Sequence, residues 1–484
     1  MTVVSEGRDS PLPVVVVDLD GTLIQGDLLW ESLWLLLKRF PKDFFLFAPL
    51  WLLQGKASFK NQLARRVVPK AENLAYRPEV LEYLAAAKAR GQRIVLASAS
   101  PHEWVQPVAD HLHFFDETLS STESINLAGA EKLKAVEALL GQAPFTYLGT
   151  SKADLPIWDK AHCATSVSPS RSALRGLAAH AQHQPLPVAA ASPIKTALKA
   201  VRPHQWIKNA LLFVPISLAH QLADVSRLLP TLAIFIAFCA VASAGYILND
   251  LMDVEDDRQH PTKRKRPIAS GQLAMPTAVL YLVALLASAA ALSTLALSPA
   301  ARAMVAGYFL LTVTYSFYFK EQLIADVFIL AGLYTYRVLA GGVASGVEVS
   351  PWLLAFSTFF FVSLALVKRY TELLSQSKSD SRTTSRRAYA VGDLPLIETM
   401  GVASATIAIL VLCLFVSSES VTLHYARPLW LWMIPPLMYY WITRIWMIAH
   451  RGELDADPVL FAAKDRMSLA TGVILAAIVW SAAA

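Results

Sequence analysis

The pattern of hydrophobic and polar positions changes partway along this chain. Up to about residue 190, short β-branched runs such as Val14–Val17 and 145–149 alternate with longer segments of mixed polarity. This alternation is typical of an α/β domain with a parallel sheet. From about residue 196 onward, long uncharged apolar runs follow one another. We therefore predict an N-terminal α/β domain over residues 1–165, a linker rich in Ala, Ser and Pro over 166–195, and an all-α membrane domain over 196–484.

The apolar runs of the second part predict nine transmembrane helices, because about 20 apolar residues span the hydrocarbon core of a bilayer. The loops after the second, fourth, sixth and eighth runs contain fifteen Lys and Arg residues, against three in the opposite loops. Cytoplasmic loops of membrane proteins carry such an excess. We therefore predict a multi-pass protein of the inner (cytoplasmic) membrane, with the N-terminal domain and the active sites on the cytoplasmic side. The runs cover residues 209–223, 231–248, 273–298, 303–319, 327–347, 349–367, 399–418, 428–443 and 467–484.

Composition agrees with this division. Of the 484 residues, 55% are hydrophobic and 17% are charged, whereas soluble proteins have about 25% charged residues. Basic cytoplasmic loops facing anionic lipids explain the net charge of +6, so we expect the bilayer, and no nucleic acid, as a partner. The three cysteines show neither metal-ligand spacing nor a disulfide framework.

A cluster of acids follows the second apolar run, where the predicted helix reaches water. On a continuing helix its members share one face. Hard oxygen ligands of this kind suit Mg²⁺ that bridges to a phosphate, and a basic run follows at once, so we predict a diphosphate site. The alternative is a solvated loop whose charges only set topology. The candidate metal ligands are Asn249, Asp250, Asp253 and Asp257, and the candidate phosphate ligands are Arg258, Lys263 and Arg266.

The stretch from Asn249 to Asp257 resembles the first Asp-rich motif of the UbiA superfamily of intramembrane prenyltransferases. Its continuation to Gly271 is similar to the decaprenyl-phosphate phosphoribosyltransferase branch, as is the segment that contains Lys208 and Asn209, two candidate substrate ligands. The resemblance implies nine helices around a cavity that opens to the cytoplasm and to lipid. It also implies phosphoribosyl diphosphate (PRPP) as donor and a polyprenyl phosphate as acceptor.

The second motif of this superfamily is matched only in part. Tyr315 and Lys320, two further candidate substrate ligands, precede the candidate metal ligand Asp326. Leu330 stands where the superfamily has a second Asp. Fewer acids suggest a different metal arrangement, which favours PRPP over a prenyl diphosphate as donor.

Three basic residues of the membrane domain are also candidates for substrate binding. Arg337 lies well inside an apolar run, where an unpaired charge is costly. We expect Asp326 or the donor's phosphates beside Arg337, in preference to snorkelling toward an interface. Lys368 and Arg369 end another apolar run. They either bind phosphate or anchor the topology.

The first predicted strand ends in the sequence Asp18-Leu19-Asp20-Gly21-Thr22. Open parallel sheets place their sites at the carboxyl ends of strands. Two carboxylates two residues apart can serve as a nucleophile on phosphorus and as a general acid and base; a turn that uses Asp and Gly for ordinary loop reasons is the alternative. Ser98 ends a second strand and can donate to a phosphate oxygen, and Lys132 opens a helix and can offset transition-state charge.

This set resembles the haloacid dehalogenase (HAD) phosphatases of the phosphoserine-phosphatase-like type over roughly residues 13–165. The resemblance implies a Rossmann-like fold with a helical cap, with Asp18 as nucleophile and Asp20 as general acid and base. Thr150 stands where the family usually has an acidic metal ligand, so the domain is either an active phosphatase or a non-catalytic module. The resemblance further implies Mg²⁺ at Asp18, the Asp20 backbone and Asp154, phosphate at Thr22 and Ser98, and charge neutralisation by Lys132.

The segment from Leu28 to Leu53, rich in Leu, Trp and Phe, occupies the position of a HAD cap. It does not span a membrane, because Lys38, Arg39, Lys42 and Asp43 interrupt it. Two interpretations stay open. The cap packs its apolar face onto the core, or it lies in the membrane interface and brings a lipid-borne phosphate to the first domain.

Together these features predict a bifunctional membrane enzyme that uses Mg²⁺. Its membrane domain transfers phosphoribose from PRPP to a polyprenyl phosphate, and its HAD domain removes the 5-phosphate from the product. The alternatives are a prenyltransferase that acts on an aromatic or other acceptor, with a separate phosphatase or a regulatory HAD module, and a transporter. A transporter would scatter charges through its spans, whereas here the charges gather at one face. Lipid chain length and oligomeric state do not follow from the sequence.

Overall fold

The computed structural model of the protein describes residues 12–123, 125–177, 182–188, 192–377, 388–418, 421, 425–454 and 457–483. The chain divides into two compact units. The first covers the chain up to residue 200 together with residues 247–280, and the second covers 201–246 and 281–484. The segment with the acidic motif therefore folds with the N-terminal domain.

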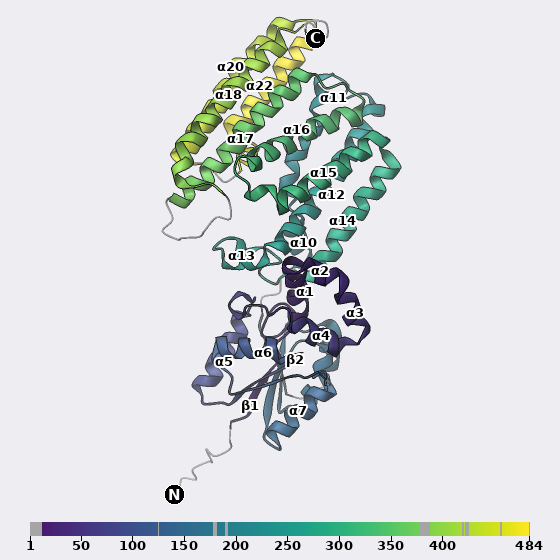
Figure 1. The fold of residues 1–484 in the computed structure, drawn as a ribbon, viewed down its shortest axis with the longest axis vertical. Coiled ribbons are helices and arrows are strands. Elements are labelled where there is room, and N and C mark those ends of the chain that lie inside the picture. The colour runs from purple at the N-terminus through teal and green to yellow at the C-terminus, as the bar shows by residue number, and fades with distance from the viewer. Residues whose placement is uncertain are drawn as a thin grey trace, which may run out of the picture. The chain divides into compact units, whose positions relative to one another are not determined.

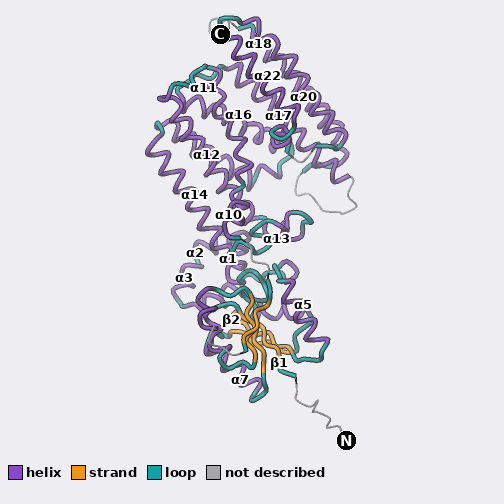
Figure 2. Tube along the Cα trace, turned by 180° about the vertical axis from the view of Figure 1, so that it is seen from behind, coloured by secondary structure: helices purple, strands orange, loops and turns teal. Residues whose placement is uncertain are grey.

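Six parallel strands form the sheet of the first unit (Figure 2). They are β1 (Val14–Val17), β2 (Ile94–Pro101), β3 (Glu117–Ser121), β4 (Phe145–Gly149), β5 (Cys163–Val167) and β6 (His183–Leu186). Their order is β3-β2-β1-β4-β5-β6, and every neighbouring pair is parallel. The strand order reverses between β1 and β4. The carboxyl ends at such a switch point form the crevice in which α/β sheets bind ligands.

Helices cover both faces of this sheet, which explains the uninterrupted valines of β1. Val15 and Val17 belong to one apolar core with Leu84, and Val14 and Val16 belong to another with Trp158. The alternation follows from the two-residue period of a strand. The α-helices of this region are α1 (Leu28–Arg39), α2 (Pro41–Leu46), α3 (Ala48–Leu53), α4 (Lys56–Ala64), α5 (Pro78–Ala89), α6 (His102–Leu112), α7 (Ala130–Leu140), α8 (Leu155–Trp158), α9 (Arg171–Leu177) and α10 (Pro193–Val201).

Part of the predicted linker belongs to the folded domain. Within residues 166–195, β6 pairs in parallel with β5, and α9 buries Ala173 and Leu177. Pro185 made this segment resemble a tether. Proline is tolerated in an edge strand, because the missing N–H would face solvent there.

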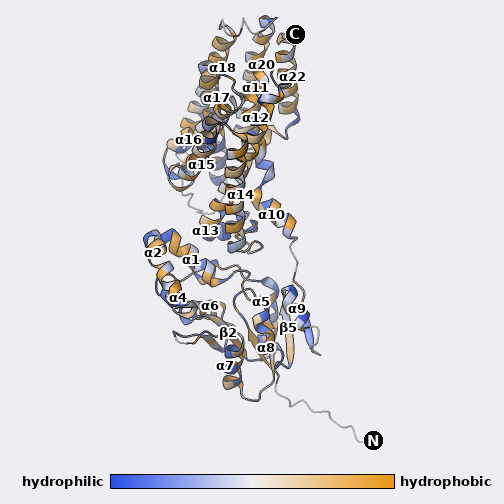
Figure 3. Cartoon of the chain, turned by 90° about the vertical axis from the view of Figure 1, so that its right-hand side faces the viewer, coloured by the Kyte–Doolittle hydropathy of each residue, from blue (hydrophilic) through white to orange (hydrophobic). Residues whose placement is uncertain are grey.

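The rest of the described chain is helical (Figure 1). The segments that follow the first domain are η3 (Pro203–Phe213), α11 (Val214–Leu218), α12 (Val225–Met252), α13 (Val254–Gln259), η4 (Lys263–Lys265), α14 (Met275–Ala296), α15 (Pro299–Phe317), η5 (Phe319–Glu321), α16 (Ala325–Ser345), α17 (Pro351–Ser377), α18 (Leu394–Val416), η7 (Pro428–Met433), α20 (Ile434–Arg451), α21 (Pro458–Ala462) and α22 (Arg466–Ala483). Figure 3 shows that α12 and α14 are mostly hydrophobic along their length.

Six helices in the described part of the chain are long and apolar enough to cross a membrane: α12, α14, α16, α17, the helix that ends with α18, and α22. The nine predicted spans are thus not confirmed. The first predicted span, 209–223, consists of the end of η3, the short helix α11 and a turn. Helices α15 and α20 match two further predicted spans in position, but they are not among the six.

Close packing in the second unit brings η3 against α16. A Cβ atom on Gly341 would lie 2.0 Å from the carbonyl oxygen of Leu212, so only glycine permits this approach. The contact matters for function, because η3 carries Asn209 and α16 carries Arg337.

Candidate active sites

The first site lies at the carboxyl end of β1. Asp18 is buried there, and the turn that follows uses Gly21 at a φ of 79°, a conformation that favours glycine. Lys132, at the start of α7, donates a 2.6 Å hydrogen bond to Oδ1 of Asp18. The Thr22 hydroxyl donates to the other oxygen of Asp18 at 3.3 Å. The structure thus brings these three predicted site residues together.

Asp20 faces the end of β2. Its Oδ2 accepts a 2.7 Å hydrogen bond from the Ser100 hydroxyl and a 3.4 Å hydrogen bond from the Ser98 hydroxyl. Its Oδ1 accepts from the backbone N–H of Leu28, at the start of the cap. Ser100 was missed by the sequence analysis. The two-residue period of a strand could have found it, because Ser98 and Ser100 share a face of β2.

Burial and neighbouring charges shift the pKa values of the acids in this site. Burial raises the pKa of Asp18 to about 6, and the positive charge of Lys132 opposes that rise. Burial, followed by the charge of Asp27, raises the pKa of Asp20 above its ordinary value. Burial alone would lower the pKa of Lys132, but Asp18 and Asp154 outweigh it and raise that pKa. An Asp with a raised pKa can carry and release a proton, as a general acid and base must.

Thr150 replaces a carboxylate with a neutral hydroxyl whose hydrogen bonds are already made. Its Oγ1 lies 3.1 and 3.0 Å from the carbonyl oxygens of Gly21 and Val167, which share its single proton, and 2.8 Å from the Thr22 hydroxyl. Asp154 is held four residues further on. It accepts hydrogen bonds from the Tyr147 hydroxyl at 2.8 Å and from the Ser151 N–H at 2.8 Å.

The donors at this edge still fit Mg²⁺. Among the described residues, no group of three or more His, Cys, Asp or Glu side chains could hold a metal. Mg²⁺, however, commonly takes one or two carboxylates, and water and substrate phosphate complete its shell. The negative charge of Asp154 raises the pKa of Asp18, so the two carboxylates are near enough to repel. A divalent cation beside both would relieve that repulsion.

A cap lysine also reaches this site. Lys60 of α4 is buried, and its Nζ donates a 2.8 Å hydrogen bond to the carbonyl oxygen of Ala99, between the two serines. Its charge opposes the rise that burial causes in the pKa of Asp20. Helix α4 has no pronounced apolar face, so its residue pattern does not indicate that this lysine points inward.

The acidic motif departs from the predicted continuous helix. Helix α12 ends at Met252, and α13 begins at Val254 after an irregular Asp253. The break still brings two acids together: one nitrogen of the Arg266 guanidinium lies 3.1 Å from Asp250 and 2.6 Å from Asp257. Burial raises the pKa of Asp257, and Arg266 opposes that rise. Two buried carboxylates that converge on one cationic atom are oxygen donors of the kind that holds Mg²⁺.

The predicted phosphate ligands of the basic run lie in different surroundings. Arg266 contacts the acids, and Lys263, in η4, is exposed. Arg258 binds within the first unit instead. Its guanidinium donates to the two carboxylate oxygens of Glu31, in α1, at 2.6 and 3.1 Å. It also donates to the carbonyl oxygens of Asn73 and Ala269, both at 2.9 Å.

The second unit holds a buried ion pair between Asp326 and Arg369. The Arg369 Nε donates to Asp326 at 2.5 Å, and the hydroxyl of Tyr389 donates to the other oxygen at 2.5 Å. Another nitrogen of Arg369 donates to the Tyr315 hydroxyl at 3.2 Å. The structure therefore joins three predicted residues, Tyr315, Asp326 and Arg369, and adds Tyr389, which carried no motif. Lys320 lies nearby in the chain, in η5.

Arg337 has different partners from those expected. Its Nε donates to Asn209 at 2.9 Å, and another nitrogen donates to the Tyr308 hydroxyl at 2.6 Å. The expectation of Asp326 beside it was wrong, because eleven residues of one helix separate them by about 16 Å along the axis. Within the described residues, no carboxylate pairs with Arg337, although its side chain is buried. The rings of Tyr308 and Tyr334 lie 4.9 and 5.3 Å from its guanidinium carbon.

Lys208 and Lys368 complete the set of predicted residues. Lys208 of η3 is buried and forms an ion pair with Asp457, which begins α21. Lys368 of α17 is half-buried. The sequence left Asp457 without a role, since nothing in its loop indicates a partner some 250 positions earlier.

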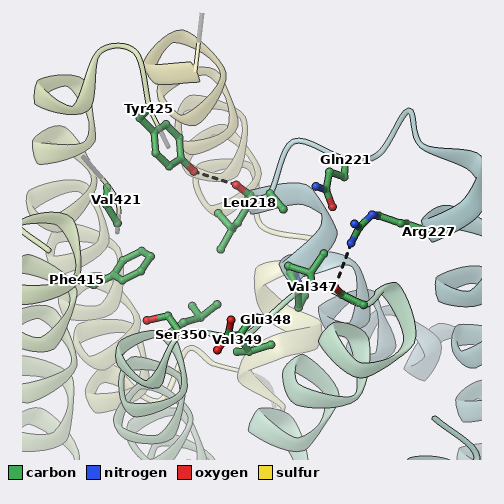
Figure 4. A pocket seen from close by; sticks show the side chains of 14 residues that line it. Leu218, Gln221, Arg227, Val347, Glu348, Val349, Ser350, Phe415, Val421 and Tyr425 are labelled. Carbon is green, nitrogen blue, oxygen red and sulfur yellow. Dashed lines mark hydrogen bonds between the residues drawn. The ribbon is translucent and has the colours of Figure 1, made fainter. Parts of the chain in front are cut away.

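A pocket in the second unit lies apart from these residues (Figure 4). Its lining includes Leu218, Gln221, Glu348 and Tyr425. It lies where α16 ends, whereas Asp326 stands at the start of that helix, about 30 Å away along its axis. The pocket therefore does not belong to the predicted transferase site.

Comparison with known proteins decides the family. The profile of the UbiA prenyltransferase family matches residues 210–472, more than half of the chain. The chain belongs to the UbiA prenyltransferase family. A second profile, haloacid dehalogenase-like hydrolase, matches residues 15–158, so this UbiA protein carries a HAD domain at its N-terminus. The predicted family membership and fusion are confirmed, and the apolar helices make the chain a multi-pass membrane protein.

Three relatives place this UbiA protein among similar chains. The uncharacterised protein y4nM of Sinorhizobium fredii is 37% identical over 97% of this chain and 90% of its own length. Nodulation protein NoeC of Azorhizobium caulinodans is 37% identical over 58% of this chain and 91% of its own length. Decaprenyl-phosphate phosphoribosyltransferase of Corynebacterium glutamicum is 39% identical over 42% of this chain and 62% of its own length.

Proposed function

We propose that this UbiA protein transfers phosphoribose from PRPP to a polyprenyl phosphate and that its HAD domain then removes the 5-phosphate. The two-step proposal rests on which segments make up the first unit. The acidic segment 247–280 and the HAD site fold as one compact body. A product released at one site therefore meets the other at a high effective concentration. The similarity to decaprenyl-phosphate phosphoribosyltransferase supports the choice of donor and acceptor.

In the transfer step, the bond between C1 of the ribose and the diphosphate oxygen breaks, and its electron pair leaves with the diphosphate. A phosphate oxygen of the lipid forms the new bond to C1. Mg²⁺ held by Asn249, Asp250, Asp253 and Asp257 would offset the charge of the leaving group.

Basic side chains of the second unit bind the phosphates in this proposal. Arg337 suits the role best, because it is a buried cation whose hydrogen-bond partners are neutral. An anionic substrate would supply the missing countercharge. Lys208 and Arg369 are already paired with Asp457 and Asp326, so they would exchange those partners for substrate oxygens or hold the site in shape.

In the second step, an oxygen of Asp18 attacks the phosphorus of the 5-phosphate and the ester bond to ribose breaks. Asp20 gives the departing ribose oxygen its proton and then takes one from the water that cleaves the aspartyl phosphate. Lys132, 2.6 Å from Asp18, orients the nucleophile and offsets charge that develops on the phosphoryl oxygens. Ser98 and Ser100 hold the Asp20 carboxylate. Mg²⁺ at Asp18, the Asp20 backbone and Asp154 would neutralise the phosphate.

One observation favours a second candidate for the HAD domain. The Thr150 hydroxyl is fully engaged by two backbone carbonyls, which is the packing of a structural residue. A HAD domain with a weak metal site would serve as a binding or regulatory module, and the transferase would act alone.

The transfer is tested with full-length protein in nanodiscs that contain a short polyprenyl phosphate, supplied with Mg²⁺ and PRPP labelled in the ribose. The proposal expects label in the lipid fraction. Asp250→Asn should remove it, and Asp224→Asn, a change of an exposed acid outside the site, should not. Label that stays in PRPP, while prenyl diphosphates with an aromatic acceptor react, would replace this proposal with prenyl transfer.

A further inference from the structure

Helices α2 and α3 expose an unusual amount of apolar surface. The inner side of α3 is packed, since Ala48 and Trp51 belong to the core of the HAD domain, and Phe44 of α2 packs against that core while partly buried. Exposed apolar surfaces of this kind mark sites of interaction. The outer surface, here called the α2–α3 face, consists of Phe45, Leu46, Leu50, Leu52 and Leu53, with exposures of 69%, 63%, 54%, 61% and 85%. Because the inner side is fixed, the α2–α3 face has a defined direction.

The preceding helix connects this face to the membrane. The carboxyl end of α1 forms two ion pairs with α13: Lys38 with Asp256 at 3.9 Å and Arg39 with Glu255 at 3.6 Å. Helix α13 begins two residues after the end of α12, a membrane-spanning candidate. All of these residues belong to the first unit. The carboxyl end of α1, from which α2 continues, is therefore held beside α13, next to the end of α12 at which a membrane-spanning α12 would leave the bilayer.

The charges of α2 and α3 suit a bilayer surface. Between residues 40 and 54 the ionisable side chains are those of Lys42 and Asp43. Asp43 is neutralised by Arg66, with 2.7 Å between their charged atoms. Lys42, in the first turn of α2, is exposed. An apolar face with a cation nearby suits helices that lie in the interface of a membrane, where anionic lipids attract the cation.

We propose that the α2–α3 face lies in the interfacial layer of the bilayer. The bilayer is the favoured occupant because this chain is itself a membrane protein and α13 directly follows the membrane-spanning candidate α12. The cap then keeps the HAD site at the lipid surface, where, if the proposed function holds, the phosphoribosyl lipid is bound. The two interpretations of the cap then both apply: its inner side packs on the core and its outer side meets lipid.

The test uses the full-length chain, with its three cysteines replaced, in nanodiscs containing anionic lipid. A polarity-sensitive fluorophore is attached at Leu53→Cys or at Leu46→Cys. The matched control is Leu174→Cys, an exposed leucine of α9 in the same unit. The proposal expects blue-shifted emission at positions 53 and 46, and quenching by lipids with spin labels near the head group that is severalfold stronger than at 174.

Equal quenching at positions 53, 46 and 174 would overturn the proposal. A blue shift that depends on protein concentration, without lipid quenching, would also overturn it and assign the face to a second copy of the chain. As a control for folding, each labelled protein should unfold at the same temperature as the unlabelled protein. The fluorescence then reports on the α2–α3 face of the folded protein. The result is independent of substrate, so a failure of the proposed function leaves this test intact.

Discussion

Replacing Glu31 by Gln removes the charge that pairs with Arg258 and keeps nearly the same shape. The guanidinium lies 2.6 and 3.1 Å from the two carboxylate oxygens, and the side chains are 9% and 8% exposed. Removing one partner of such a buried pair costs about 3–5 kcal/mol, because the other charge stays buried without a counter-ion. We expect this loss to appear as weaker docking of the acidic segment on the HAD domain.

Hydrogen exchange of the segment 255–270 measures this docking, since exchange reports local opening free energies. A loss of 3 kcal/mol corresponds to about a hundredfold faster exchange through opening. The matched control is Asp256→Asn, which removes a pair with Lys38 at 3.9 Å whose side chains are 22% and 46% exposed. Exposed pairs contribute about 0–1 kcal/mol, so this variant should exchange at most severalfold faster.

Equal exchange of Glu31→Gln and Asp256→Asn in this segment would contradict a strong contribution from the buried Glu31–Arg258 pair. Exchange of the β1 and β4 peptides serves as an internal reference, because the sheet should stay protected in both variants. A reversed pair, Glu31→Arg with Arg258→Glu, should recover part of the protection if the charges interact directly.

Three further outcomes follow from the structure. Thr150→Asp supplies the missing acid and should lower the Mg²⁺ concentration that half-saturates phosphatase activity; an unchanged requirement would place the metal elsewhere. Arg337→Gln should reduce transfer on the order of a hundredfold by removing a buried cation, whereas Arg302→Gln, an exposed arginine, should leave transfer unchanged. Gly271→Ala should destabilise the first unit by about 1–3 kcal/mol, because φ is 76° and the new Cβ would lie 2.4 Å from Gln25. Gly141→Ala, where φ is 60° and no atom lies near the new Cβ, measures the cost of the backbone conformation alone. Equal losses of stability for the two variants in urea unfolding would show that the contact with Gln25 costs nothing.

The local pattern of apolar residues was enough to predict the main strands and helices. The valines of β1 indicate a strand buried on both faces, and Asp18 and Asp20 follow it at the sheet edge that the topology makes a site. Lys132 meets Asp18 because the ends of parallel strands and the starts of their helices share one edge. The long apolar runs likewise indicated helices where α12, α14, α16 and α17 occur.

Partners far apart in sequence could not be predicted. Arg258 looked like a phosphate ligand because it begins a basic run, but its partner Glu31 is 227 positions earlier. Asp253 looked like part of a continuous helix, since spacing alone does not reveal that α12 stops before it. Arg337 was expected beside Asp326 or the phosphates of the donor, yet in this structure tyrosine rings and an amide contact it. In each case tertiary packing determines the contacts and the helix end, and these cannot be read from the local sequence.

The most direct test of the two-step account compares wild type with Asp18→Asn in nanodiscs containing PRPP, Mg²⁺ and a polyprenyl phosphate. Lipid products and free inorganic phosphate are followed together, with the exposed Asp159→Asn as the control. The account predicts a ribosyl lipid and inorganic phosphate from wild type and control, and a phosphoribosyl lipid without inorganic phosphate from Asp18→Asn. A phosphoribosyl lipid as the end product of all three proteins would contradict it.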